Sequence, residues 1–213
     1  MEKSGKKKLV EYSCADFAAL LSSKAPVPGG GGAAALTGAL GAALCAMAGS
    51  LTLGKPKYAA FEGDLRRMLE DAEGIRRRLL ELVDEDAAAF APLAEAYSLP
   101  KDDPERAKVL ERASLCACEA PLAMMRQIGR AIELLSEMLE KGSALLLSDV
   151  GCGALLCKAA LESASLNVFV NTASLPKEMA RPLEEEAEGL LETYAPIARR
   201  VAEEVFRRVR KEG

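Results

Sequence analysis

The sequence predicts an all-α fold: a bundle of about six helices with a long central helix. Apolar residues recur every three or four positions through most of the 213 residues, and no stretch alternates strictly as a half-buried strand would. Prolines and glycines divide the chain into segments of helical length. No repeat or low-complexity linker separates two halves. Residues 1–213 are therefore assigned to one domain, with residues 1–12 as a flexible or loosely packed N-terminus.

The helices are expected in a simple order along the chain. Ser13 and Asp16 resemble a capping box and open a short helix that ends near Leu21. The others are expected at about 30–53, 61–97, 104–142, 147–173 and 176–210. Because an interior proline removes a helical hydrogen bond, kinks or breaks are expected at Pro92, Pro121 and Pro196.

The composition argues against several classes of function. The net charge is -4, and no cluster of Lys and Arg supplies the basic field that a nucleic-acid binder needs. The first residues are charged and lack the apolar stretch of a secretory signal. We therefore expect a cytoplasmic protein with six reduced cysteines and no nucleic-acid partner. No C-x-x-C pair is present, so no metal site is expected.

The segment from Ala33 to Leu53 carries no charge and is long enough to cross a bilayer. It consists mainly of Ala and Gly, lacks an aromatic belt, and no second span is recognised elsewhere in the chain. A helix buried at the centre of a soluble bundle explains the segment better. No membrane partner is expected.

Four glycines follow two prolines in PVPGGGG, from Pro26 to Gly32, where the second helix begins. A dinucleotide fingerprint or a P-loop would need a preceding strand, and GSLTLGKP at 49–56 has proline where a P-loop has Ser or Thr. Both nucleotide motifs are therefore rejected. Free N–H groups at a helix start suit a carboxylate or the polar edge of a ligand. A flexible turn with tight packing is the alternative interpretation.

Asp86 interrupts the apolar seam of the long third helix. The seam consists of Leu65, Met68, Ala72, Ile75, Leu79, Leu82, Asp86, Ala89, Leu93 and Ala96. Asp84 and Glu85 fall off it and are expected to be solvated. The chain has no histidine, so acid–base chemistry must use a carboxylate, Cys, Lys or Tyr with a shifted pKa. Asp86 is such a candidate, unless it caps a partner helix or pairs with a cation.

Ser163, Asn167 and Asn171 are spaced by four and form a polar stripe on the otherwise apolar fifth helix. Two amides on one face could read the donor and acceptor edge of a heterocycle. Alternatively, they form interhelical hydrogen bonds that fix the register of the bundle.

Six segments, in this order and spacing, resemble one family: PVPGGGGAAALTGALGAAL, LTLGKPKY, LLELVDEDAAAF, SLPKDDPE, LSDVGCGALL and LNVFVN. From about Ser13 to Arg210 the chain resembles the cyclodeaminase/cyclohydrolase family of folate enzymes. The resemblance implies an all-helical homodimer with folate sites near the subunit interface. It implies conversion of 5-formiminotetrahydrofolate to 5,10-methenyltetrahydrofolate and ammonia. Methenyltetrahydrofolate cyclohydrolase activity, or a non-catalytic helical dimerisation protein, are the alternatives.

The resemblance places the family's catalytic acid on Asp86. Substrate binding is expected at Pro28, Gly29, Gly30, Gly31, Lys55, Lys57, Tyr58, Asp149, Asn167 and Asn171. By their chemistry, the two lysines suit the glutamate tail of a tetrahydrofolate derivative, polyglutamylated or not, and the two asparagines suit its pterin edge. No cofactor beyond the tetrahydrofolate substrate is expected. Gly32 stands where the family usually has serine, and loss of a substrate-binding hydroxyl there would shift specificity.

Overall fold

The computed structural model describes residues 7–211, which form six α-helices and no strand. The helices are α1 (Cys14–Leu21), α2 (Gly30–Thr52), α3 (Glu62–Ser98), α4 (Arg106–Lys141), α5 (Leu147–Thr172) and α6 (Lys177–Arg210). Short 3-10 helices occur at η1 (Leu9–Glu11), η2 (Pro56–Phe61) and η3 (Ala144–Leu146). The all-α prediction is confirmed, and every predicted helix lies within a few residues of an observed one.

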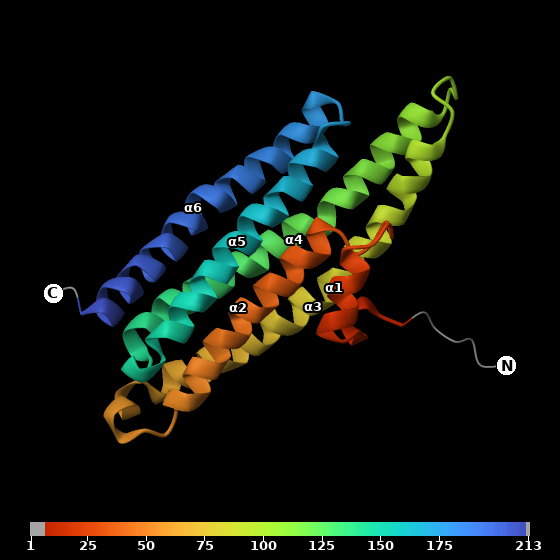
Figure 1. Ribbon diagram of the computed structural model, residues 1–213. Coiled ribbons are helices and arrows are strands. Elements are labelled where there is room, and N and C mark those ends of the chain that lie inside the picture. Colours follow the sequence, from red (N-terminus) through yellow and green to blue (C-terminus); the bar gives the residue numbers. More distant parts are fainter. Residues whose placement is uncertain (1–6, 212–213) are drawn as a thin grey trace.

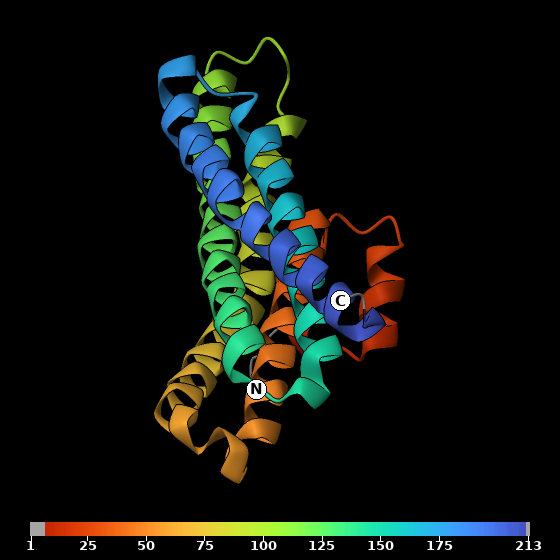
Figure 2. The ribbon, with the colours of Figure 1, turned by 90° about the vertical axis from the view of Figure 1, so that its left-hand side faces the viewer.

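Helices α2 to α6 form an up-and-down bundle in which each helix runs opposite to the one before it (Figure 1). Helix α2 packs against α3, α4 and α5, and α6 packs against α4 and α5. The loop after α2 and the turn before α5 lie at the same end of the bundle (Figure 2). Residues that are far apart in sequence are therefore gathered at two separate ends of α2.

Small residues let α2 lie close to α5 at the centre of the bundle. A Cβ atom on Gly41 would lie 3.0 Å from the carbonyl oxygen of Gly153 and would overlap Cys157 Sγ. A Cβ atom on Gly153 would lie 3.2 Å from the carbonyl oxygen of Gly41. The Ala- and Gly-rich composition of the uncharged segment is thus a packing requirement of two closely spaced helices.

Two helices, α2 and the segment 144–172, are long and apolar enough to cross a membrane by length and composition. The expectation that the chain has no second such span is therefore wrong. The second segment escaped notice because Asp149, Lys158 and Glu162 interrupt it. Helices α2 and α5 lie side by side (Figure 1), and both keep exposed apolar side chains, which together we call the α2/α5 face. Its exposed side chains are Leu40, Met47, Leu51, Leu155, Leu166 and Val170.

The segment before α1 packs against α3. Leu9 and Tyr12 contact the hydrophobic core, and the Leu9 N–H donates to Asp84 Oδ1 at 2.7 Å. The expectation of loose packing is therefore wrong for residues 9–12, while residues 1–6 lie outside the described part of the chain. Asp84 is half-buried rather than solvated, and its Oδ2 has no hydrogen-bond partner among the described residues. Helical periodicity missed this because η1 covers the flank of α3 beside the seam.

The interior prolines do not break the helices that contain them. Helix α3 runs through Pro92, α4 through Pro121, and α6 through Pro196. Each helix has buried residues on both sides of its proline, and this packing holds the two parts together. Of the kinks or breaks expected at these positions, the breaks do not occur, and the kinks stay a prediction.

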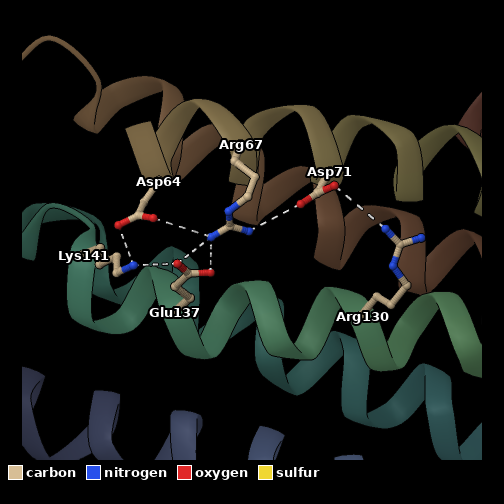
Figure 3. A network of polar contacts seen from close by, with 6 residues as sticks. All are labelled: Asp64, Arg67, Asp71, Arg130, Glu137 and Lys141. Carbon is tan, nitrogen blue, oxygen red and sulfur yellow. Dashed lines mark hydrogen bonds and ion pairs between the residues drawn. The ribbon is translucent and has the colours of Figure 1, made fainter. Parts of the chain in front are cut away.

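Charged side chains join α3 to α4 along one edge of the bundle (Figure 3). Arg67 donates to both carboxylate oxygens of Glu137 at 2.6 Å. Lys141 contacts Glu137 at 2.7 Å and Asp64 at 2.6 Å. The network also includes Asp71, which lies 3.4 Å from Arg67. Three ion pairs thus join the two helices: Arg67–Glu137, Lys141–Asp64 and Arg130–Asp71.

We expect Arg67→Ala to lower the free energy of unfolding by about 1 kcal/mol, the upper end for exposed ion pairs. Arg66→Ala is the matched control, because Arg66 pairs with Glu62 within its own helix. Its effect should be a few tenths of a kcal/mol, as for other ~0.3–0.5 kcal/mol helical pairs. Urea unfolding at low and high salt measures both, and salt should reduce the difference. Equal losses in the two variants would contradict a cross-helix network.

Candidate functional site

A cavity of about 150 Å³ lies where the start of α2 meets α3, α4 and α5. The loop before α2 and four helices line it, through Pro26, Val27, Gly29, Gly30, Gly31, Asp86, Phe90, Ala117, Asn167, Val170 and Asn171. The structure therefore brings together the glycine loop, the seam carboxylate and both asparagines. Pro28 is buried beside the loop and is not part of the lining.

Asp86 lies against the first turn of α2. Gly29, the N-cap of this helix, has no side chain that could cap it. The backbone N–H of Gly32 instead donates to the Asp86 carboxylate, which caps α2 from the neighbouring helix. Burial raises the pKa of Asp86 to about 6, and the Gly32 hydrogen bond opposes this rise. Asp86 therefore both caps α2 and has a pKa close to neutral pH.

Gly31 provides the space that the Asp86 carboxylate occupies. A Cβ atom on Gly31 would lie 2.6 Å from both Cγ and Oδ2 of Asp86, and nearer still to Oδ1. Such contacts are far inside van der Waals distance, so the carboxylate and a side chain at position 31 exclude each other. Gly30 is less constrained, because its Cβ atom would lie 3.5 Å from the Asn167 amide.

A side chain at position 32 would point away from the cavity. Its Cβ atom would lie 3.3 Å from Pro28 Cβ and 3.6 Å from Val83 Cγ1. A serine hydroxyl at this position would therefore begin in an apolar pocket between these two residues. The geometry gives no support to a substrate contact there, and the contribution of Gly32 is its backbone N–H.

Both asparagines line the cavity and also form hydrogen bonds to backbone carbonyls. Asn167 Nδ2 donates to the carbonyl of Ser163 at 2.8 Å. Asn171 Nδ2 donates to the carbonyl of Ala117 on α4, also at 2.8 Å. Because Pro121 has no N–H, the carbonyl of Ala117 lacks its usual helical donor, and Asn171 supplies one. The hydrogen bond from Asn171 to Ala117 joins α5 to α4 and can fix the register of the two helices. Asn171 nevertheless still lines the cavity.

Four of the expected substrate-binding residues lie at the opposite end of α2: Lys55, Lys57, Tyr58 and Asp149. Helix α2 has 23 residues and is therefore about 35 Å long. A single chain thus does not bring these residues to the Asp86 cavity. Within one chain the expected substrate-binding residues therefore fall into two groups, because the loop after α2 and the loop before it lie at opposite ends of that helix.

The distal group has its own polar structure. The Tyr58 hydroxyl accepts a hydrogen bond from the Ala144 N–H at 3.2 Å, and this bond lowers the pKa of Tyr58. Lys55 Nζ lies 3.5 Å from Ser143 Oγ, and Lys57 lies beside the Tyr58 ring. Two ammonium groups therefore flank a polar turn that precedes α5, an arrangement suited to an anionic group.

Five residues that line the cavity were not among the expected site residues: Pro26, Val27, Phe90, Ala117 and Val170. Phe90 follows Asp86 by one helical turn, so helical spacing could have identified it. The role of Ala117 is a backbone carbonyl, and its only signal in the sequence is Pro121 four residues later. Val170 lies between the two asparagines and is 64% exposed, which makes it part of both the cavity wall and the α2/α5 face.

Comparison with known proteins identifies relatives of this chain. Residues 13–189 match the family described as formiminotransferase-cyclodeaminase. The chain is 42% identical over 194 residues to a methenyltetrahydrofolate cyclohydrolase of Methylorubrum extorquens, covering 89% of this chain and 93% of that protein. It is 32% identical over 167 residues to the mouse formimidoyltransferase-cyclodeaminase, covering 76% of this chain but 31% of that longer protein.

The fold is similar to that of a solved enzyme. The crystal structure of formiminotetrahydrofolate cyclodeaminase from Thermotoga maritima superposes with a TM-score of 0.82 and 26% sequence identity. The match covers 93% of this chain and all of that one. The cyclodeaminase and cyclohydrolase names of these relatives agree with the expected enzyme class, and the chain belongs to the formiminotransferase-cyclodeaminase family of folate one-carbon enzymes.

Proposed function

We propose that this enzyme hydrolyses 5,10-methenyltetrahydrofolate to 10-formyltetrahydrofolate. The observation that carries the proposal is Asp86, the one ionisable side chain among the described residues that line the cavity. Its pKa of about 6 suits proton transfer near neutral pH. The similarity to the Methylorubrum cyclohydrolase extends over nearly the whole of both chains and favours this reaction over its alternative.

The carboxylate can serve each step of the hydrolysis. Ionised Asp86 stabilises the cationic methenyl bridge and takes a proton from the water that attacks its carbon. The tetrahedral adduct then opens by breaking the bond between that carbon and N5. Asp86 returns the proton to N5, the adduct's hydroxyl loses its remaining proton to solvent, and the formyl group remains on N10. One proton is released overall, which balances the positive charge of the methenyl substrate, and no further cofactor is needed.

Cyclodeamination of 5-formiminotetrahydrofolate is the second candidate reaction, and the fold shared with the Thermotoga cyclodeaminase favours it. N10 attacks the carbon of the protonated formimino group, and Asp86 transfers the proton from N10 to the departing amine. Ammonia leaves, and the methenyl cation remains beside the carboxylate. Both reactions place the same carbon next to Asp86.

A spectrophotometric assay tests the proposal, because the methenyl compound absorbs and can be followed directly. The purified protein is incubated in parallel with 5,10-methenyltetrahydrofolate and with 5-formiminotetrahydrofolate. The proposal predicts faster loss of the first than occurs without enzyme. Acceleration of only the formimino reaction would favour the second candidate. No acceleration of either would indicate the non-catalytic helical protein.

We expect kcat/KM to rise as the pH increases through about 6, the pKa of Asp86. The sign follows from the mechanism, because the carboxylate must be ionised to accept the first proton. Activity should be largely lost at a pH two units below this value. A pH–rate profile measures it, after correction for the uncatalysed reaction. A profile that is flat from pH 5 to 8, an interval around the pKa, would contradict Asp86 as the base.

We further propose that the functional unit is a homodimer formed through the α2/α5 face. Leu166 is 68% exposed and Val170, which also lines the cavity, is exposed to a similar extent. A second copy packed on this face would therefore border the cavity. The cavity is below the ~300–1,000 Å³ of pockets that enclose a drug-sized ligand, so one chain encloses only part of a folate.

An antiparallel arrangement of two copies would also unite the two ends of α2. The Lys55 end of one copy would lie beside the Asp86 end of the other, and the glutamate tail of a folate could reach the lysines. A lipid-facing role suits this face less well, since Lys158 and Glu162 form an ion pair on α5. The proposal is therefore a soluble, cytoplasmic homodimer.

We expect Leu166→Glu to convert the dimer into a folded monomer with little activity, because a charge would be buried against apolar side chains. The matched control is Val109→Glu, which adds the same charge at an exposed position on α4, away from this face. Light scattering and circular dichroism measure assembly and helicity. A wild-type monomer at micromolar concentration, or a dimeric Leu166→Glu variant, would contradict the proposed interface.

A further inference from the structure

The amides of Asn167 and Asn171 have fixed orientations. Each Nδ2 donates to a backbone carbonyl, that of Ser163 for Asn167 and that of Ala117 for Asn171, both at 2.8 Å. A carbonyl oxygen can only accept a hydrogen bond, so the amide nitrogen must be the atom that faces it. The Oδ1 atom of each amide therefore points elsewhere.

The two amide oxygens remain available to a ligand. Among the described residues, the one buried side-chain polar atom without a partner is Asp84 Oδ2, so neither asparagine oxygen is sealed inside the protein. Both side chains line the cavity. Val170, on the same helix, is apolar and offers no side-chain donor. The α5 side of the cavity thus presents two amide oxygens as hydrogen-bond acceptors, beside the second N–H of each Nδ2.

The opposite side of the cavity presents backbone donors beside the Asp86 carboxylate. It is formed by Gly30 and Gly31 in the first turn of α2, where backbone N–H groups have no partner within the helix. A ligand that fits between the two sides must carry donors along one edge and an acceptor elsewhere. A pterin has this pattern, because its 2-amino group and N3–H are donors and its 4-oxo oxygen is an acceptor.

We propose that Asn167 and Asn171 select the ligand ring by accepting hydrogen bonds from its 2-amino group and N3–H. This inference rests on the proposed folate site and assigns one polar edge of the substrate to α5. The asparagines do not act in the chemical step. They are specificity-determining residues. Pro121 supports this role indirectly, because it leaves the Ala117 carbonyl free to accept from Asn171 and so to orient its amide.

Binding of two small probes tests the inference. The probes are 6-methyltetrahydropterin and its 2-desamino analogue, which lacks the donors of the amino group but adds no bulk. Calorimetry on the assembled wild-type protein should show the first binding at least about ten-fold more tightly, because an acceptor left unpaired in a cavity is costly. Equal affinities, or no measurable binding of 6-methyltetrahydropterin, would overturn the proposal.

Three variants separate recognition from structure. Asn171→Ala removes the acceptor and should reduce the affinity ratio of the two probes several-fold. Asn171→Asp keeps an oxygen toward the ligand and should keep the affinity ratio. Its melting temperature should be lower, because a carboxylate would face the Ala117 carbonyl. Ser114→Ala removes a hydrogen bond between α4 and Ser174, in the turn after α5, at 2.7 Å, and should leave the ratio unchanged. An unchanged ratio in Asn171→Ala would show a purely structural role.

The outcome is independent of the catalytic proposal. A protein that discriminates between the probes but accelerates neither folate reaction would retain this inference and lose the proposed function. A protein that hydrolyses methenyltetrahydrofolate but binds both probes equally would support the proposed function and contradict this inference.

Discussion

Asp86→Asn should lower turnover by ~10²–10⁴, the range for loss of a general acid–base, while folate affinity changes much less. Asparagine has nearly the same shape and keeps an oxygen that can accept from the Gly32 N–H. It cannot accept and return a proton. The measurement is kcat and KM for both candidate reactions, with the variant's helicity checked by circular dichroism.

The same variant should be more stable than the wild type at alkaline pH. The folded-state pKa of Asp86, about 6, lies above the ordinary 3.8, so its ionisation opposes folding. Its favourable contribution is complete below pH 3.8 and is lost as the pH rises through 6. The difference is about 3 kcal/mol at most. Thermal melts should therefore favour Asp86→Asn at pH 8, two units above that pKa, and show no such advantage near pH 4.

Glu70→Gln is the appropriate control for Asp86→Asn. Glu70 is exposed on the same helix, whereas Asp84, the neighbouring aspartate, anchors Leu9 and is unsuitable. The control should retain wild-type activity and stability. A folded, fully active Asp86→Asn protein would contradict the mechanism. Equal losses in the control would show that the effect is not specific to the cavity.

Gly31→Ala should abolish most activity and lower the free energy of unfolding by ~1–3 kcal/mol, the usual cost of overpacking. The added Cβ atom would overlap the Asp86 carboxylate, so either the side chain or the first turn of α2 must move. Both movements separate the carboxylate from its place in the cavity. Steady-state kinetics and urea unfolding measure the two effects.

Gly74→Ala is the matched control for Gly31→Ala. Gly74 lies within α3, and a Cβ atom there would meet nothing within 4 Å. The change should stabilise the protein by about 0.5–1 kcal/mol through helix propensity and leave activity unchanged. If Gly31→Ala were as active and stable as this control, the close contact with Asp86 would not exist.

The fold could be predicted from the sequence because its main signals are local. The spacing of apolar residues and the positions of Gly and Pro determine where helices begin and end. The seam of α3 is buried from Leu65 to Leu82, as its periodicity indicated. Non-local packing caused the errors. The burial of Asp84 depends on η1, and the continuity of α4 at Pro121 depends on the helices beside it.

The sequence indicated the residue types of the candidate site but not its geometry. Asp86 stood out because a charge on an apolar seam is unusual, and the glycines because they precede a helix. Their contact depends on the antiparallel packing of α2 and α3, which periodicity does not specify. The separation of Lys55 from Asp86 follows from the length of α2. The segments that carry the family resemblance contain both residues. They do not indicate whether Lys55 and Asp86 of one chain contribute to the same site or to the sites of two different subunits.

Complementation between two inactive variants tests the central claim, that the two ends of α2 serve one ligand only when two copies combine. Asp86→Asn and Lys55→Ala are co-expressed with different tags, and the mixed dimer is isolated. One of its two sites is then intact, so the mixed dimer should regain about half of the wild-type activity, while each parental dimer has little. A mixed dimer no more active than its parents, or a fully active Lys55→Ala protein, would contradict the account.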